Sequence, residues 1–137
     1  MLAKLDALKK YEDVGLFILR MTVALLLAVR QGWPTFLHFL EGSTEFPDPL
    51  HIGARATMGM MVFTELFCAV AISIGVLTRL FCIPVIIGFT VAIFVHHLSD
   101  PLSYKELPIL YWGGFLAILF LGPGKYSVDY FLLKKQN

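Results

Sequence analysis

Two long apolar blocks stand almost end to end in residues 56–98, which read ATMGMMVFTELFCAVAISIGVLTRLFCIPVIIGFTVAIFVHHL. The first block, residues 56–77, is long enough to cross about 30 Å of hydrocarbon as a helix that rises about 1.5 Å per residue. Only Thr78 and Arg79 separate it from the second block, residues 80–98. The two blocks therefore predict a tight antiparallel hairpin of membrane-spanning helices.

A further apolar block lies on each side of this hairpin. The block before it covers about residues 14–34, where Pro34 is expected to bend or end the helix. The block after it covers about residues 107–121 and ends in the helix breaker Leu-Gly-Pro-Gly. Of the 137 residues, 58% are hydrophobic and 15% are charged, whereas a soluble domain has about 25% charged residues.

These blocks predict an all-α integral membrane protein that forms one domain over residues 1–137. The mean hydropathy of +0.76 agrees with a chain that is mostly embedded in lipid. The predicted domain is a four-helix bundle with spans at about 14–34, 56–77, 80–98 and 107–121.

The Lys and Arg residues in the flanks divide unequally between the two sides of this bundle. Seven lie on the side that holds both termini and the short turn, and three lie on the other side. By the positive-inside rule, both termini and the short turn are cytoplasmic and the long first loop, residues 31–55, is outside. Residues 126–135 predict a short amphipathic segment at the inner surface.

Glu65 lies nine residues into its apolar block, where lipid makes a charged side chain costly. We expect it to face the bundle interior and to pair with Arg20, inside the first span, or with Arg30, near its outer end. Two interpretations stay open. One is a structural role, as an ion pair or as a protonated carboxyl bonded to a neighbour such as Thr64, and the other is a functional proton or quinone site.

All four histidines and two aspartates fall on the predicted outer side, namely His38, His51, His96, His97, Asp48 and Asp100. Imidazole and carboxylate groups together can relay protons or bind a transition metal. His96 and His97 are adjacent, however, and point about 100° apart around a helix axis, so they cannot easily share one ion. We therefore predict no metal site, and we interpret the histidines as interfacial residues hydrogen-bonded at helix ends.

The predicted outer side is also where a ligand site is expected. The first loop, at about 25 residues, is long enough to fold over the bundle as a lid. A cavity there would be roofed by Phe39, Phe46 and Pro47 and floored near Glu65. Trp33 would lie at the same interface.

Six short stretches carry a family resemblance that follows most of residues 14–130: GLFILR at 15–20, QGWP at 31–34, EL at 65–66, GVLTR at 75–79, AIFVHHL at 92–98 and LGPGKYSVD at 121–129. With them the chain resembles the DoxX family of small four-span bacterial membrane proteins. Thr35 departs from the family pattern, in which many relatives have a basic residue after the Gly-aromatic turn. The resemblance implies a multi-pass protein of the bacterial inner membrane.

The resemblance also implies a link to redox chemistry, because the family name derives from a small subunit associated with quinone-linked sulfur oxidation. The leading hypothesis is an accessory subunit of an oxidoreductase rather than a self-sufficient enzyme. In it a quinone, or a lipid-like molecule, lies near Glu65, Arg30 and the aromatic Trp33 and Trp112. The candidate ligand or proton residues are Glu65, Arg20, Arg30, His97, His96 and Trp33.

Two alternatives come from other functional classes. One is a small transporter or permeability factor for a hydrophobic or weakly acidic solute, with Glu65 as the proton-coupled group. The other is a structural membrane anchor. The expected partners are the lipid bilayer, subunits of a redox complex and a second copy of the chain, whereas a net charge of +1 gives no support for nucleic acid binding.

Overall fold

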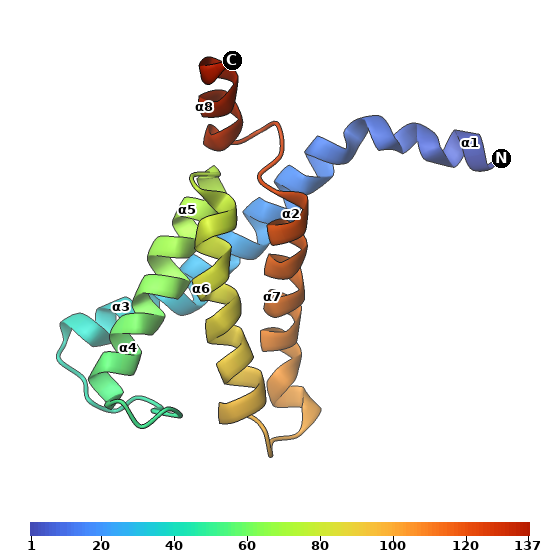
Figure 1. Cartoon of the computed structure of the whole chain (residues 1–137). Coiled ribbons are helices and arrows are strands. Elements are labelled where there is room, and N and C mark those ends of the chain that lie inside the picture. The colour runs from blue at the N-terminus through green and yellow to red at the C-terminus, as the bar shows by residue number, and fades with distance from the viewer.

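The structure is a bundle of helices that confirms the predicted all-α fold class (Figure 1). It is a computed structural model that describes residues 1–137, apart from the side chains of Lys4 and Leu5. Within this part of the chain the backbone forms four long helices and one short C-terminal helix, and it forms no strand.

The first long helix is continuous but changes its pitch along its length. It consists of α1 (Leu2–Leu5), the 3₁₀ helix η1 (Asp6–Tyr11), α2 (Glu12–Leu27), the π-helix η2 (Ala28–Gly32) and α3 (Trp33–Leu40). Pro34 does not end this helix, contrary to one of the two outcomes that the sequence predicts. The π turn directly before it widens the helix where the proline ring would meet the carbonyl group of Arg30.

The second and third long helices follow the predicted apolar blocks within three residues, whereas the fourth begins five residues before its block. The second consists of α4 (Ala54–Val62), the π-helix η3 (Phe63–Cys68) and α5 (Ala69–Ile74), the third of α6 (Thr78–Val91) and the π-helix η4 (Ala92–His96), and the fourth of α7 (Leu102–Leu121). Each of these three is long and apolar enough to cross a membrane. The first long helix packs on α5 and α7 through α2, and on α4 through α3. Its own crossing of the bilayer stays a prediction.

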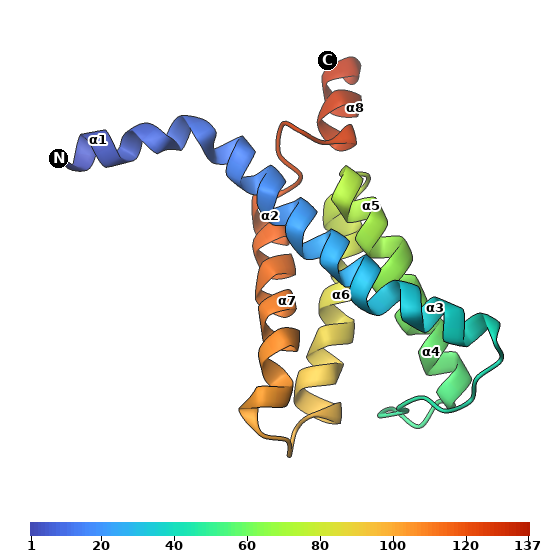
Figure 2. The ribbon, with the colours of Figure 1, turned by 180° about the vertical axis from the view of Figure 1, so that it is seen from behind.

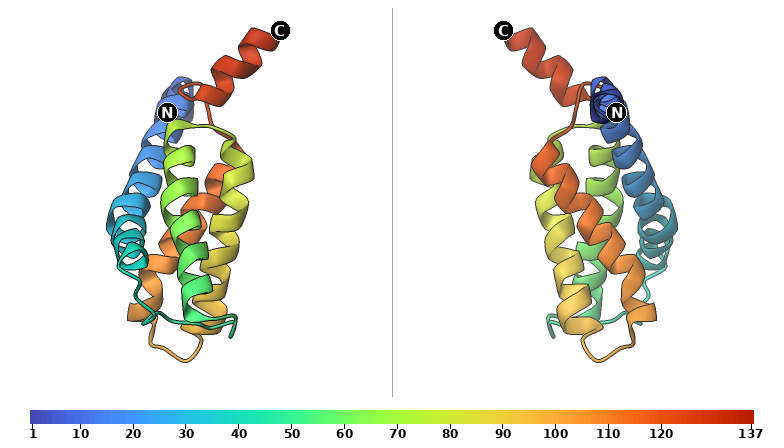
Figure 3. Two further views of the ribbon diagram at one scale, coloured as in Figure 1. Left: turned by 90° about the vertical axis from the view of Figure 1, so that its left-hand side faces the viewer. Right: turned by 90° about the vertical axis from the view of Figure 1, so that its right-hand side faces the viewer.

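The two ends of the bundle differ in character. Both chain termini and the turn between α5 and α6 lie at one end, which we call the termini end (Figures 1 and 2). The loops of residues 41–53 and 97–101 lie at the opposite end, which we call the loop end. At the termini end α8 (Val128–Gln136) projects from the bundle (Figure 3). The predicted C-terminal segment is thus helical, and its place on a membrane surface stays a prediction.

The sequence predicts the hairpin turn at residues 78–79, but in the structure it lies at residues 75–77. Gly75 ends α5 in the left-handed conformation with φ +82°. The carboxyl group of Asp129 accepts hydrogen bonds from the backbone N–H groups of Leu77 (2.7 Å) and Thr78 (2.9 Å). Because this remote carboxylate satisfies free N–H groups at the start of α6, that helix begins two residues before the predicted span.

The core of the bundle combines small residues on three helices with aromatic rings. Its buried members are Ala24, Leu27, Ala28, Cys68, Ala69, Ile72, Cys82, Val85, Phe89, Tyr111, Phe115 and Ile118. Alanine and cysteine allow helix backbones to approach closely, as is typical of helix contacts in membranes. Phe89 stacks on Tyr111 with 5.3 Å between ring centroids. This stack joins α6 to α7, and both rings also line the cavity described next.

Candidate functional site

The first and second long helices cross in close contact at Gly32 and Glu65. Both residues belong to π-helical turns, η2 and η3, which face each other. A Cβ atom on Gly32 would lie 2.4 Å from the backbone carbonyl oxygen of Glu65 and 2.8 Å from the backbone nitrogen of Leu66. Any side chain would therefore push the helices apart. Glycine at this position fixes the point from which the Glu65 side chain leaves its helix.

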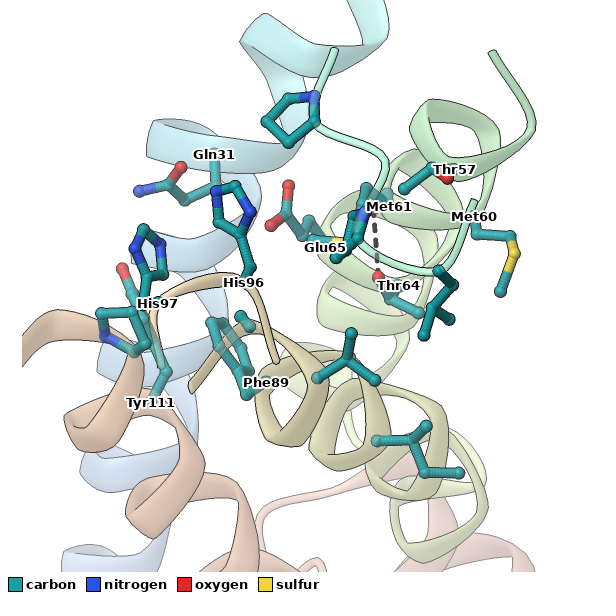
Figure 4. Close-up of a pocket in the computed structure, with 18 of the residues that line it drawn as sticks. Gln31, Thr57, Met60, Met61, Thr64, Glu65, Phe89, His96, His97 and Tyr111 are labelled. Atoms are coloured by element: carbon teal, nitrogen blue, oxygen red, sulfur yellow. Dashed lines mark hydrogen bonds between the residues drawn. The ribbon is translucent and has the colours of Figure 1, made fainter. Parts of the chain in front are cut away.

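A cavity of about 840 Å³ opens beside this crossing. It lies between α4 and η3 on one side and α6, η4 and α7 on the other, and part of the 41–53 loop covers it. The polar residues in its wall are Gln31, Thr57, Thr64, Glu65, His96, His97, Ser103, Tyr104 and Tyr111 (Figure 4). The rest of the wall is apolar. This composition suits a small molecule that is mainly apolar and carries a few hydrogen-bonding groups.

Glu65 faces this cavity and is only 8% exposed. Figure 4 shows its carboxyl group directed toward the side on which Gln31 and His96 are drawn. The hydroxyl group of Thr35 lies beside the carboxyl group, and it also donates to the carbonyl oxygen of Gln31 at 2.8 Å. The predicted burial inside the bundle is therefore seen. A buried carboxyl group at this depth in a membrane protein is a candidate proton carrier.

The predicted ion pair between Glu65 and an arginine is not formed. Among the described side chains, ion pairs join His38 to Glu41 and His97 to Asp100, and neither includes Glu65. Arg20, one of the two expected partners, lies at the other end of the bundle.

Arg20 is 1% exposed and is held by backbone carbonyl groups at the termini end. Its Nε atom donates to the carbonyl oxygen of Ser73 at 3.2 Å, and its two terminal nitrogens donate to those of Pro123 and Tyr126. Carbonyl oxygens satisfy the guanidinium donors without a carboxylate partner. Arg20 therefore ties the first helix to the second and to the segment after α7, and it takes no part in the cavity.

Arg30 and Trp33 do not reach the cavity either. Arg30 is exposed, and Trp33 is 51% exposed and packs on Phe36 with 5.8 Å between ring centroids. Trp112 donates from Nε1 to the hydroxyl group of Thr90 at 3.1 Å, outside the cavity wall.

The four histidines separate into two groups. His96 and His97 line the cavity, with ring centroids 4.4 Å apart. The Nδ1 atom of His97 lies 2.6 Å from a carboxylate oxygen of Asp100. This contact orients the imidazole ring and leaves Nε2 for another partner. His38 and His51 are exposed and lie outside the wall.

Comparison with known proteins agrees with this architecture. The sequence model of the DoxX family matches residues 15–98, which include the Gly32–Glu65 crossing and both cavity histidines. The chain belongs to the DoxX family. It is 29% identical over 135 residues to the inner membrane protein YqjF of Escherichia coli (strain K12), a match that covers 93% of this chain and 99% of that protein. No solved structure matches the chain.

In this DoxX-family protein the predicted lid, residues 31–55, is shorter than expected, because the first helix continues to Leu40 and α4 begins at Ala54. The 41–53 loop forms what remains of it. Phe46 and Pro47 line the cavity, as expected. Phe39 does not, because it packs beneath the guanidinium group of Arg55, with 4.5 Å from the Arg55 Cζ atom to the ring centroid. Sequence reasoning did not identify Gln31, Met61 or Tyr111 as wall residues. The only available signal was the position of Gln31 within the QGWP stretch.

Asp48 fastens this lid to the start of α4. Its carboxylate accepts hydrogen bonds from the backbone N–H groups of Ile52 (3.1 Å) and Gly53 (2.8 Å) and from the hydroxyl group of Thr57 (2.9 Å). Desolvation raises the pKa of Asp48, but these hydrogen bonds and the neighbouring His51 lower it by more, so that the pKa lies below its ordinary value. The lid is therefore held by a charged form of Asp48.

Proposed function

We propose that this DoxX-family protein binds a lipid-soluble, weakly polar molecule of the quinone type, as an accessory subunit of a membrane redox assembly. The observation that carries the proposal is the cavity of about 840 Å³, which is mainly apolar and contains the Glu65 carboxyl group and two histidines. A quinone ring is planar and apolar, and its carbonyl oxygens accept hydrogen bonds. Its chemical requirements match this wall.

Proton exchange is the role that we assign to the polar wall. Reduction of a quinone to a quinol takes up two electrons and two protons. In this proposal Glu65 and the His97–Asp100 pair bring protons to the bound ring, and a partner subunit supplies the electrons. The pair lies at the loop end, where Asp100 is exposed, so it offers a route between solution and the cavity.

The proposed location is the inner membrane of a bacterial cell, with several spans and both termini in the cytoplasm. The name of the E. coli relative, an inner membrane protein, supports this location. The excess of Lys and Arg at the termini end supports the orientation. In that orientation the lid and the cavity lie on the outer side. The proposed partners are subunits of the redox assembly and a second copy of this chain.

The test is quinone binding by the purified chain in lipid nanodiscs. Mass spectrometry of the extracted sample should show a quinone at near-stoichiometric amount, and decylubiquinone should bind to the emptied protein. We expect Glu65→Gln and His97→Ala to weaken decylubiquinone binding at least fivefold, because each removes a polar contact in the wall. Glu106→Gln and His38→Ala are the matched controls, since both positions are exposed and lie outside the cavity.

Absence of quinone from the extract, together with no binding of decylubiquinone, would refute the proposed function. Equal effects of the cavity variants and their controls would place the binding elsewhere. Uptake of a weakly acidic solute by proteoliposomes that depends on Glu65, in a protein that binds no quinone, would support a transporter instead.

A further inference from the structure

The cavity has an opening toward lipid in addition to its lid. Met60 and Phe63 on the second helix and Ile87 on the third all line the cavity. The same three side chains are 55%, 47% and 58% exposed. Side chains that border a cavity and also lie on the outer surface mark the edge of an opening. The opening therefore lies between the second and third long helices.

The depth of this opening is in the middle of the membrane. Phe63 is the tenth residue of the helix Ala54–Ile74, and Ile87 is the tenth residue of the helix Thr78–His96. Both helices are long and apolar enough to cross a bilayer, so their central residues lie at the level of the acyl chains. The opening between these side chains therefore faces the acyl chains of the bilayer, and an apolar chain can pass through it.

The polar part of the cavity wall lies far from the opening, and the apolar part lies next to it. Figure 4 shows Gln31, Glu65 and His97 on one side and Met60 on the opposite side. The hydroxyl groups nearer to Met60 already have partners, since Thr64 donates to the carbonyl oxygen of Met61 at 3.2 Å and Thr57 donates to Asp48. The groups that keep hydrogen-bonding capacity for an occupant, such as the Glu65 carboxyl group and the Nε2 atom of His97, are therefore those far from the opening.

We infer that the occupant is an amphiphile with a single apolar chain, whose polar head lies at Glu65, His96 and His97 and whose chain leaves between Phe63 and Ile87 into the bilayer. This inference rests on the proposed function and names the ligand class of the same site. A chain longer than the cavity need not fold back inside, because the opening lets it remain in lipid. The ligand reaches the site sideways from the membrane and bypasses the lid.

The experiment compares two probes with the same head, 2,3-dimethoxy-5-methyl-1,4-benzoquinone without a chain and decylubiquinone, on protein in nanodiscs. Ile87→Trp narrows the opening, and Ile83→Trp is its control, one turn away on the same helix, exposed and outside the wall. We expect Ile87→Trp to weaken decylubiquinone binding at least tenfold and to change binding of the chainless probe less than twofold. Ile83→Trp should change neither.

A second pair of variants guards against misfolding of the tryptophan variant. Phe63→Ala widens the opening, and Phe67→Ala removes an exposed ring one turn away that does not line the cavity. Phe63→Ala should raise the association rate of decylubiquinone at least threefold, whereas Phe67→Ala should not. Equal effects on both probes, or no effect of either cavity variant, would overturn the side opening while leaving the quinone site intact. Failure of the unmodified protein to bind either probe would overturn the proposed function itself.

Discussion

Substitution of Gly32 by alanine tests whether the helix crossing at Glu65 determines the site. The added Cβ atom would lie 2.4 Å from the backbone carbonyl oxygen of Glu65 and 2.6 Å from its carbonyl carbon. Because both are backbone atoms, no side-chain rotation relieves the overlap, and the helices must separate by roughly 0.6–1 Å. Overpacking of this kind costs about 1–3 kcal/mol. We expect the free energy of unfolding to fall by that amount, and decylubiquinone binding to weaken because Glu65 moves.

The measurement is equilibrium unfolding in mixed micelles, followed by circular dichroism as the fraction of denaturing detergent rises. Gly15→Ala and Gly113→Ala are matched controls, because a Cβ atom at either helical position meets nothing within 4 Å. Alanine favours a helix over glycine by about 0.5–1 kcal/mol, so both controls should be neutral or stabilising. A Gly32→Ala protein as stable as the controls, with unchanged ligand binding, would refute the close crossing.

Three further predictions concern the two ends of the bundle. Arg20→Gln should lower the free energy of unfolding by about 2–6 kcal/mol, because two of the three buried carbonyl groups lose their donor at about 1–3 kcal/mol each. Arg79→Gln, at an exposed position, should cost under about 1 kcal/mol in the same assay. Asp48→Ala should speed amide hydrogen exchange in the lid. The pKa of Asp48 is lowered in the folded protein, so the stability that its carboxylate adds to the lid is present above the ordinary value of 3.8 and is lost as pH falls through the folded value. The unmodified protein should therefore show the same loosening of the lid only below pH 3.8. The variant should show no such pH dependence. Cysteines added near Asp48 and near Gln136 should label from opposite sides of the membrane, and labelling of both from outside would contradict the orientation.

The lengths and positions of the apolar blocks were enough to predict most of the fold. The predicted spans 56–77 and 80–98 correspond to helices at Ala54–Ile74 and Thr78–His96. The shift of two or three residues has a local cause and a remote one. Val76 and Leu77 are apolar and extend the hydropathy signal, yet Gly75 ends the helix by its left-handed conformation. The first N–H groups of the next helix donate to the carboxylate of Asp129, which lies 51 residues from Thr78. No local sequence pattern predicts this contact.

The site was only partly predictable, for a related reason. A lone carboxyl group in an apolar block marks Glu65 as buried and facing the bundle, because lipid excludes other placements. The same reasoning expected Arg20 or Arg30 to pair with Glu65. Backbone carbonyl groups hold the Arg20 guanidinium group instead, and such acceptors carry no sequence signature. Gly32 was part of a quoted motif, but its role depends on a backbone contact with another helix. Such contacts are set by tertiary packing.

The position of the Arg20 acceptors has a consequence for how the protein is made. The carbonyl oxygens of Pro123 and Tyr126 lie 103 and 106 residues further along the chain than the guanidinium group that they bind. The first helix therefore leaves the ribosome and meets the membrane long before its arginine has those acceptors. Until the last helix has been synthesised, the charge must be solvated by water or lipid headgroups at the membrane surface. Biosynthesis of this small protein is complete only when its final segment closes over its first helix, and a chain that stops after Leu121 leaves a buried cation without two of its three acceptors.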